Sequence, residues 1–204
     1  MHDGPVPNHV AYTSGERRET GATVDTSSAH PSAKEFERDL VAKGARPKSC
    51  VYVSTPITTG PLTLENSSGV AANDLIAKNV SHARDIVART ALKVDAIVID
   101  PTQFDDVEGW EQPDYHNFWL EIIDVYVAQI VFCDGWEFST GCCIEFLRAH
   151  ELQLPRLDER LRPLLDVDSL DLLTTAIARM GAVGLTTTAQ RRALHALAAR
   201  AQDA

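Results

Sequence analysis

A glutamate near the start of a predicted helix is the side chain best placed for chemistry in this sequence. Glu145 follows the apolar run 130–133 and a polar turn, and it stands four residues after Gly141. A carboxylate in the first turns of a helix is favoured by the helix dipole for structural reasons alone. It can also attack a carbon that carries a leaving group, as a covalent nucleophile. The residues around it must decide between the two interpretations.

The neighbours of this glutamate favour a binding cleft. Ser139 and Gly141 place a hydroxyl and bare backbone at a helix start, which suits an anion or a sugar hydroxyl. Trp136 offers a flat ring on which a base or sugar could stack, and packing against the core is the alternative. Tyr52, on an earlier predicted strand, has a hydroxyl that needs a partner if it is buried.

Two residues in the segment 114–121 are candidates for proton transfer to a leaving group. His116 and Glu121 both belong to the entry of a predicted helix at the same edge of the sheet. Either one could act as a general acid if it faces the cleft, and a capping or surface role is the alternative for His116. The acidic loop before this helix is interpreted as a solvated rim, with a mobile lid or a cation site as the alternative.

Short apolar runs alternate with helical periodicity along the middle of the chain. Strands are predicted at 50–53, 96–99 and 130–133, and helices at 73–92, 116–127 and 141–151. Continuous apolar strands separated by helices are typical of a parallel sheet that is covered on both faces. The predicted fold class is therefore α/β, a three-layer, mainly parallel sheet flanked by helices, Rossmann-like or flavodoxin-like.

Polar residues collect where these strands end. Ligands in such sheets bind beyond the carboxyl ends of the strands, so these positions are predicted to form the substrate site, with Asp100 at the end of the second strand. The predicted substrate-binding residues are Ser54, Thr55, Pro56, Asp134, Gly135, Trp136, Ser139 and Gly141.

The two ends of the chain differ from its middle. Residues 1 to about 33 lack periodicity and are predicted to be disordered, with a short helix at 34–43. We therefore divide the chain into a mostly disordered tail with a short helix (1–46), an α/β domain (47–156) and a helical C-terminal extension (157–204). The extension either docks or dimerises, or it binds a partner helix.

Charge and cysteine content narrow the partners. A formal net charge of −10 disfavours nucleic-acid polymers, whose binding needs a basic surface. Among the 4 cysteines, the adjacent Cys142 and Cys143 lack the spacing of a zinc site or a disulfide framework, so we expect packing roles and no metal. Neither a signal peptide nor a membrane-spanning run is predicted, so we expect a cytoplasmic protein without a membrane partner.

The strand ends and the helix start together resemble a known family. The resemblance rests on the first strand with residues 54–56, on Asp100-Pro101, and on the motif G-W-x-x-S-x-G-x-x-x-E from Gly135 to Glu145. These features are similar to the nucleoside 2-deoxyribosyltransferase-like superfamily, and closest to its DUF4406 branch. The resemblance spans roughly residues 48–156.

The resemblance implies a two-step displacement at a glycosidic bond. The residue at the position of Glu145 attacks the anomeric carbon of a (deoxy)ribosyl group, releases the base and forms an ester, which a second base or water resolves. A Tyr at the position of Tyr52 orients the nucleophile, and a Ser at the position of Ser139 helps hold a 5′-phosphate. The expected activity is cleavage or transfer of the N-glycosidic bond of a nucleoside or nucleoside 5′-monophosphate, without a cofactor.

The chain departs from the family at three places. The transferases carry an Asp upstream of the third strand, where Glu121 is the nearest acid here, and they often carry an acid where Ser139 stands. The first-strand loop lacks the basic residue that some phosphohydrolases use. A non-catalytic nucleotide-binding or sensing module is therefore an alternative. An NAD-cleaving glycohydrolase is another, because related sheets use a similarly placed Glu. We also consider a homo-oligomer, because the family often completes its site from a neighbouring subunit.

Overall fold

The computed structural model describes residues 30–58, 60, 72–104 and 107–202. The predicted tail before residue 30, most of the loop 57–72, and Asp105 and Asp106 lie outside this part. The strands are β1 (Cys50–Ser54), β2 (Val98–Ile99), β3 (Val127–Phe132) and β4 (Arg156–Asp158). The helices are α1 (Pro31–Ala42), α3 (Ala72–Ala91), α4 (Gln112–Tyr126), α5 (Thr140–Glu151), α6 (Asp166–Ala182) and α7 (Thr188–Gln202), with short 3₁₀ turns η1 (Pro101–Gln103) and η2 (Trp136–Phe138).

The four strands form one parallel sheet in the order β2-β1-β3-β4. The chain leaves β1 through α3 to reach β2 on one side, and returns through α4 to reach β3 on the other side. The carboxyl end of β1 is therefore the point where the strand order reverses. In open α/β sheets this switch point is the usual place for a ligand.

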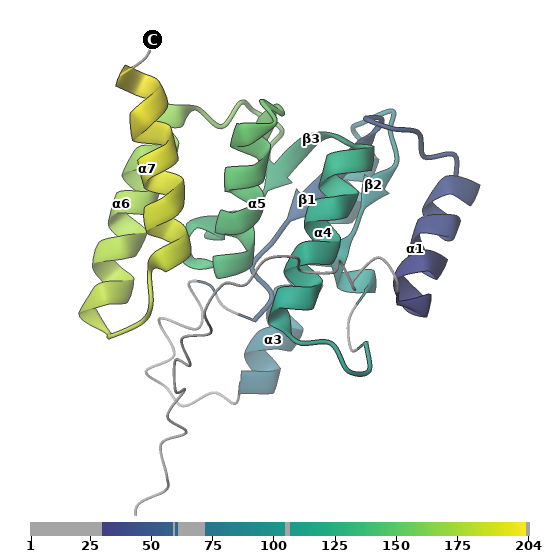
Figure 1. The fold of residues 1–204 in the computed structure, drawn as a ribbon, viewed down its shortest axis with the longest axis horizontal. Helices are drawn as coiled ribbons and strands as arrows, with labels where there is room; N and C mark the ends of the chain where they lie inside the picture. Colours follow the sequence, from purple (N-terminus) through teal and green to yellow (C-terminus); the bar gives the residue numbers. More distant parts are fainter. Residues whose placement is uncertain (1–29, 59, 61–71, 105–106, 203–204) are drawn as a thin grey trace, which may run out of the picture.

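Alternate side chains of each strand point to opposite faces of the sheet, as strand geometry requires. Val51 and Val53 pack with Ile86 of α3 on one face. Cys50 and Tyr52 pack with residues of α4 and α5 on the other face, which Figure 1 shows in front of the strands. The predicted fold class, a three-layer α/β arrangement of Rossmann-like type, is confirmed.

The helix α1 belongs to the folded body through an aromatic cluster. Its Phe36 contacts Phe104, Phe118 and Trp119, with ring centroids 5.5, 5.6 and 5.5 Å away. Trp119 in turn lies 5.7 Å from the ring of Tyr52. The cluster thus packs against the Tyr52 ring and limits its movement.

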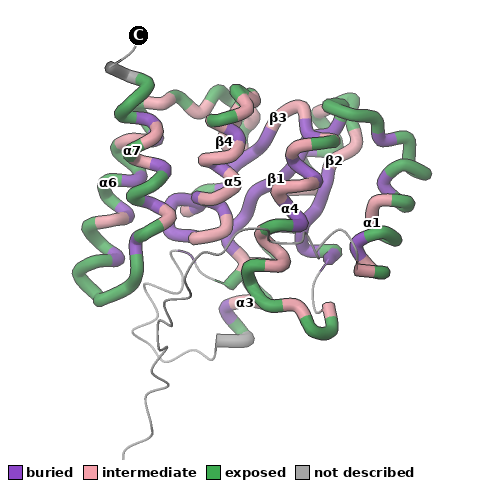
Figure 2. The backbone as a smooth tube through the Cα atoms, viewed as in Figure 1, coloured by how far each residue is buried: buried purple, intermediate pink, exposed green. Residues whose placement is uncertain are grey.

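The C-terminal helices share the main core. Leu173 of α6, and Ala193 and Leu197 of α7, lie in the same buried cluster as β1 and α5. Figure 2 shows the inner sides of α6 and α7 buried and their outer sides exposed. The predicted boundaries between the tail, the α/β domain and the extension stay predictions. Residues of α1, α6 and α7 all pack into the same hydrophobic core as the sheet.

Three differences from the predicted elements have local causes. The strand β3 begins at Val127, inside the stretch predicted to be helical, because no Gly or Pro separates α4 from the strand. The strand β4 was not predicted, since its sequence Arg-Leu-Asp is short and charged at both ends. The helix α4 begins at Gln112, where Glu111 and Asp114 form a capping box. Two acids of the predicted rim are therefore explained by helix capping.

Candidate active site

The candidate nucleophile is held from the first strand. Tyr52 and Ser54 are two residues apart on β1, so their side chains point to the same face, toward α5. The Tyr52 hydroxyl donates a 2.7 Å hydrogen bond to Oε1 of Glu145. The Ser54 hydroxyl donates a 2.6 Å hydrogen bond to Oε2 of the same side chain. Both carboxylate oxygens are therefore fixed by donors at the carboxyl end of the central strand.

Burial dominates the electrostatics of this carboxylate. Tyr52 and Ser54 are 0% exposed, and the carboxylate loses much of its hydration beside them. This desolvation raises the pKa of Glu145 to about 7, although the hydrogen bonds from Ser54 and Tyr52 favour the ionised form and oppose the rise. The pKa of Tyr52 is raised well above 10, first by burial and then by the nearby Glu145. Tyr52 therefore keeps its proton and donates near neutral pH, whereas Glu145 changes its charge there.

The start of α5 is capped by Ser139 and lies close to His116. Ser139 is the N-cap, and its Oγ accepts a 3.4 Å hydrogen bond from the backbone N–H of Cys142. A Cβ on Gly141 would lie 3.4 Å from Nε2 of His116, so glycine lets the imidazole approach the helix start closely. The structure thus brings Ser139, Gly141 and His116 to the same end of α5 as Glu145.

His116 and Glu121 lie on different sides of α4. Trp119 faces Tyr52, and His116, three residues earlier, lies within about 60° of it around the helix axis. Glu121, two residues after Trp119, is turned away by about 200°. Helix geometry therefore favours His116 over Glu121 as a partner of the cleft. Burial lowers the pKa of His116 below 6.5, so its imidazole is neutral near pH 7.

The segment after Ser54 is compact where it is described. Thr55 and Pro56 are buried, and Gly60 returns against the proline ring, with only 2.9 Å from an added Cβ to Cβ of Pro56. A carbonyl of this segment, on Ile57, accepts a hydrogen bond from Asn79 of α3. The predicted contact of Thr55 and Pro56 with a substrate stays a prediction.

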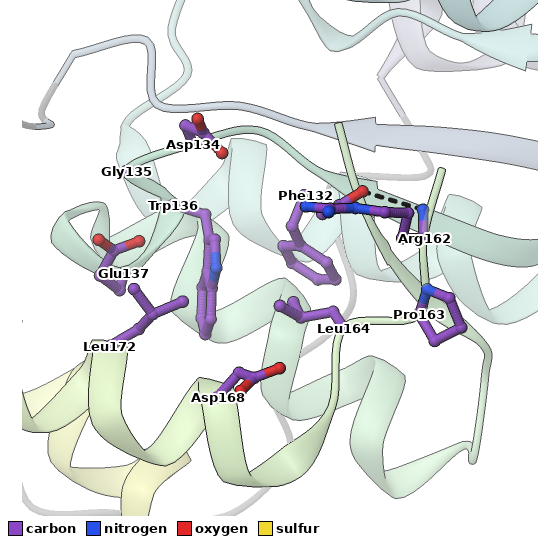
Figure 3. Close-up of a pocket in the computed structure, with 11 residues that line it drawn as sticks. Phe132, Asp134, Gly135, Trp136, Glu137, Arg162, Pro163, Leu164, Asp168 and Leu172 are labelled. Atoms are coloured by element: carbon purple, nitrogen blue, oxygen red, sulfur yellow. Dashed lines mark hydrogen bonds and ion pairs between the residues drawn. The ribbon is translucent and has the colours of Figure 1, made fainter. Parts of the chain in front are cut away.

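The predicted residues Asp134, Gly135 and Trp136 line a different hollow. This pocket of about 600 Å³ opens between η2, the end of β3 and the start of α6 (Figure 3). Tyr52, Ser54 and Glu145 are not among its lining residues. Trp136 is 2% exposed and stacks on Phe146, with centroids 4.4 Å apart and an angle of 13°. The packing alternative therefore describes this tryptophan better than a platform for a base.

Two acids near the predicted strand ends, Asp100 and Glu137, are buried away from Glu145's hydrogen bonds. Asp100 is buried and caps η1 by accepting hydrogen bonds from the backbone N–H and the hydroxyl of Thr102. Glu137, whose position in the motif drew no separate prediction, is buried, and desolvation raises its pKa. It lines the pocket of Figure 3 from the side of η2.

Cys142 is a neighbour of the site that the sequence interpretation assigned only to packing. Its thiol is buried beside the hydroxyls of Ser139 and Ser54, and burial raises its pKa well above 9. Cys142 stands three residues before Glu145, so helix geometry puts both side chains on the same face. This spacing could have predicted that Cys142 lies beside the site. All four cysteines are free and buried.

Comparisons with protein-family models, with curated proteins and with solved structures find no match to this chain. The resemblance to the nucleoside 2-deoxyribosyltransferase-like superfamily therefore stays a prediction from the motif. The geometry at Glu145 carries the functional argument.

The described residues contain no group of three or more His, Cys, Asp or Glu side chains arranged to hold a metal ion. Across the same residues, no helix is both long and apolar enough to cross a membrane.

Proposed function

We propose that this protein cleaves or transfers the N-glycosidic bond of a nucleoside or nucleoside 5′-monophosphate, with Glu145 as the covalent nucleophile. The observation that carries the proposal is the pair of hydrogen bonds from Tyr52 and Ser54 to the two oxygens of Glu145. They fix a desolvated carboxylate at the switch point of the sheet, where ligands of such folds bind.

A purely structural role for Glu145 explains these features less well. The helix dipole acts mainly on charges within the first turn, and Glu145 is the sixth residue of α5. Glu145 instead pays a desolvation cost that raises its pKa to about 7. Perturbed carboxylates of this kind collect at active sites, because a nucleophile or base must be poised near the working pH.

In the first chemical step, one carboxylate oxygen attacks the anomeric carbon as the bond to the base nitrogen breaks. The base leaves with the electron pair of that bond and takes up a proton from solvent. His116, neutral near pH 7, supplies a hydrogen bond to the leaving base. In the second step, water or another base attacks the same carbon, the ester bond breaks, and Glu145 recovers its carboxylate.

The test is release of free base from a panel of nucleosides, their 5′-monophosphates and NAD, followed by chromatography. Wild-type protein should release base, and Glu145→Gln should reduce the rate by at least 1,000-fold, on the scale seen when a catalytic nucleophile is removed. Glu151→Gln is the matched control, because this residue lies on the same helix, is exposed and pairs with Arg148. It should keep the wild-type rate.

Three outcomes would contradict the proposal. A wild-type rate of base release in Glu145→Gln would show that Glu145 is not the nucleophile. Nucleotides that raise the melting temperature without any base release favour a non-catalytic binding module. Nicotinamide release from NAD, with no turnover of nucleosides or monophosphates, favours the glycohydrolase alternative.

A further inference from the structure

The hydroxyl of Ser54 is buried and hydrogen-bonded to Glu145. Ser54 is 0% exposed, and its Oγ is 2.6 Å from Oε2 of Glu145. A hydroxyl has a single hydrogen to donate, and this bond uses it. Ser54 is the last residue of β1, where the backbone is paired with β3 at Phe132. The strand register therefore sets the position of this donor.

We propose that Ser54 is a positioning residue, which holds Oε2 of Glu145 and keeps the carboxylate in its attacking orientation. This inference rests on the proposed function in naming Glu145 as the nucleophile. Tyr52 holds Oε1 through a ring wedged against Trp119, and Ser54 holds Oε2 through the backbone of the same strand. With both oxygens held by β1, rotation of the carboxylate group about its terminal bond breaks one or both hydrogen bonds.

The hydroxyl of Ser54 also favours the ionised state of Glu145. Hydrogen bonds to the charged form stabilise it, and here the bond from Ser54 opposes the effect of burial more than the bond from Tyr52 does. The other titratable groups around the site are Cys142 and Cys143 on α5, Asp100 at the end of β2 and His116 on α4. None of these four carries a positive charge near pH 7, so Ser54 and Tyr52 are the groups that favour the carboxylate.

A direct titration of Glu145 tests the role of Ser54 without any substrate. The protein is labelled with ¹³C at the glutamate side chains, and the Glu145 carboxyl signal is identified by its loss in Glu145→Gln. Ser54→Ala should raise the pKa of Glu145 by about 1, as expected for a hydrogen bond to a charged acceptor. Ser54→Thr keeps the hydroxyl and should restore the wild-type titration. Ser49→Ala, an exposed serine just before the same strand, should leave it unchanged.

Activity then separates positioning from a loss of structure. At pH 6, Ser54→Ala should release base about 10-fold more slowly than wild type, since about one tenth as much of its Glu145 is ionised. At pH 9 most of that difference should disappear. The melting temperature and circular dichroism of Ser54→Ala confirm that the variant is folded.

The outcomes distinguish a failure of this inference from a failure of the proposed function. An unchanged pKa of Glu145 in folded Ser54→Ala overturns the inference, whether or not the protein cleaves nucleosides. An equal loss of activity at pH 6 and pH 9 also overturns it, because that pattern indicates general damage. If the pKa rises as expected but wild-type protein releases no base from any substrate, Ser54 positions Glu145 and the proposed reaction is wrong.

Discussion

The Tyr52 hydroxyl donates a 2.7 Å hydrogen bond to Oε1 of Glu145, joining residues 93 positions apart in the sequence. The bond connects the central strand to the helix that follows β3 across the interior of the molecule. Because Tyr52 is fully buried and its pKa is raised well above 10, its hydroxyl keeps its proton and remains a donor near neutral pH.

Tyr52→Phe removes the donor and keeps the packing of the ring. A hydrogen bond to a charged group contributes about 1.5–3 kcal/mol, so kcat/KM at pH 7 should fall by roughly 10- to 100-fold. The loss should be smaller at pH 9, where Glu145 is ionised even without the bond. Steady-state base release at the two pH values checks this. A rate equal to wild type at pH 7 would show that the bond is not used in catalysis.

The activity of the wild-type protein should rise with pH through about 7. Glu145 attacks only when it is ionised, and its pKa is raised to about 7, so protonation removes the nucleophile below that value. His116, whose pKa burial lowers below 6.5, is neutral above pH 7 and adds no second limb between pH 7 and pH 9. The measurement is kcat/KM from pH 5 to pH 9. A profile that is flat from pH 5 upward would mean that the catalytic group has an ordinary carboxyl pKa.

His116→Ala tests the hydrogen bond proposed for the leaving base. The variant should lose at least 10-fold in activity on an ordinary purine nucleoside, on the scale of general acid–base or hydrogen-bond assistance. On a nucleoside whose base is already cationic, such as 7-methylguanosine, it should retain nearly the wild-type rate, because that base needs no assistance. Equal losses on both substrates would assign His116 to packing at the start of α5.

The buried carboxylate should also affect stability. Glu145 has a higher pKa folded than unfolded, so its contribution to stability is fully present below about pH 4.5 and is lost as pH rises through about 7. Glu145→Gln removes this titration. At pH 9 the variant should therefore be more stable than wild type, by roughly 3 kcal/mol in the free energy of unfolding. Urea unfolding at pH 5 and pH 9 measures it, and a stability difference that does not vary with pH would contradict the buried ionisation.

The sequence predicted the layered sheet because continuous apolar strands and periodic helices are strong local signals. The approach of Glu145 to Tyr52 was expected from the family resemblance. The hydrogen bond of Ser54 to the same carboxylate was not, although strand alternation puts Ser54 on the same face as Tyr52. Trp136 shows the limit of such reasoning. Its position after a strand end suggested a stacking surface for a base or sugar, with core packing as the alternative, and only the packed structure shows that Phe146, ten residues later, is its stacking partner.

The most direct test of the mechanism is to trap the glycosyl ester on Glu145. The protein is mixed with a substrate that it cleaves, quenched in acid within a single turnover, digested, and examined by mass spectrometry. The mechanism predicts that the peptide containing Glu145 gains the mass of one pentosyl group, that fragmentation places the group on Glu145, and that Glu145→Gln shows no such peptide. Base release by wild type with this peptide unmodified at every quench time, together with retained activity in Glu145→Gln, would contradict it.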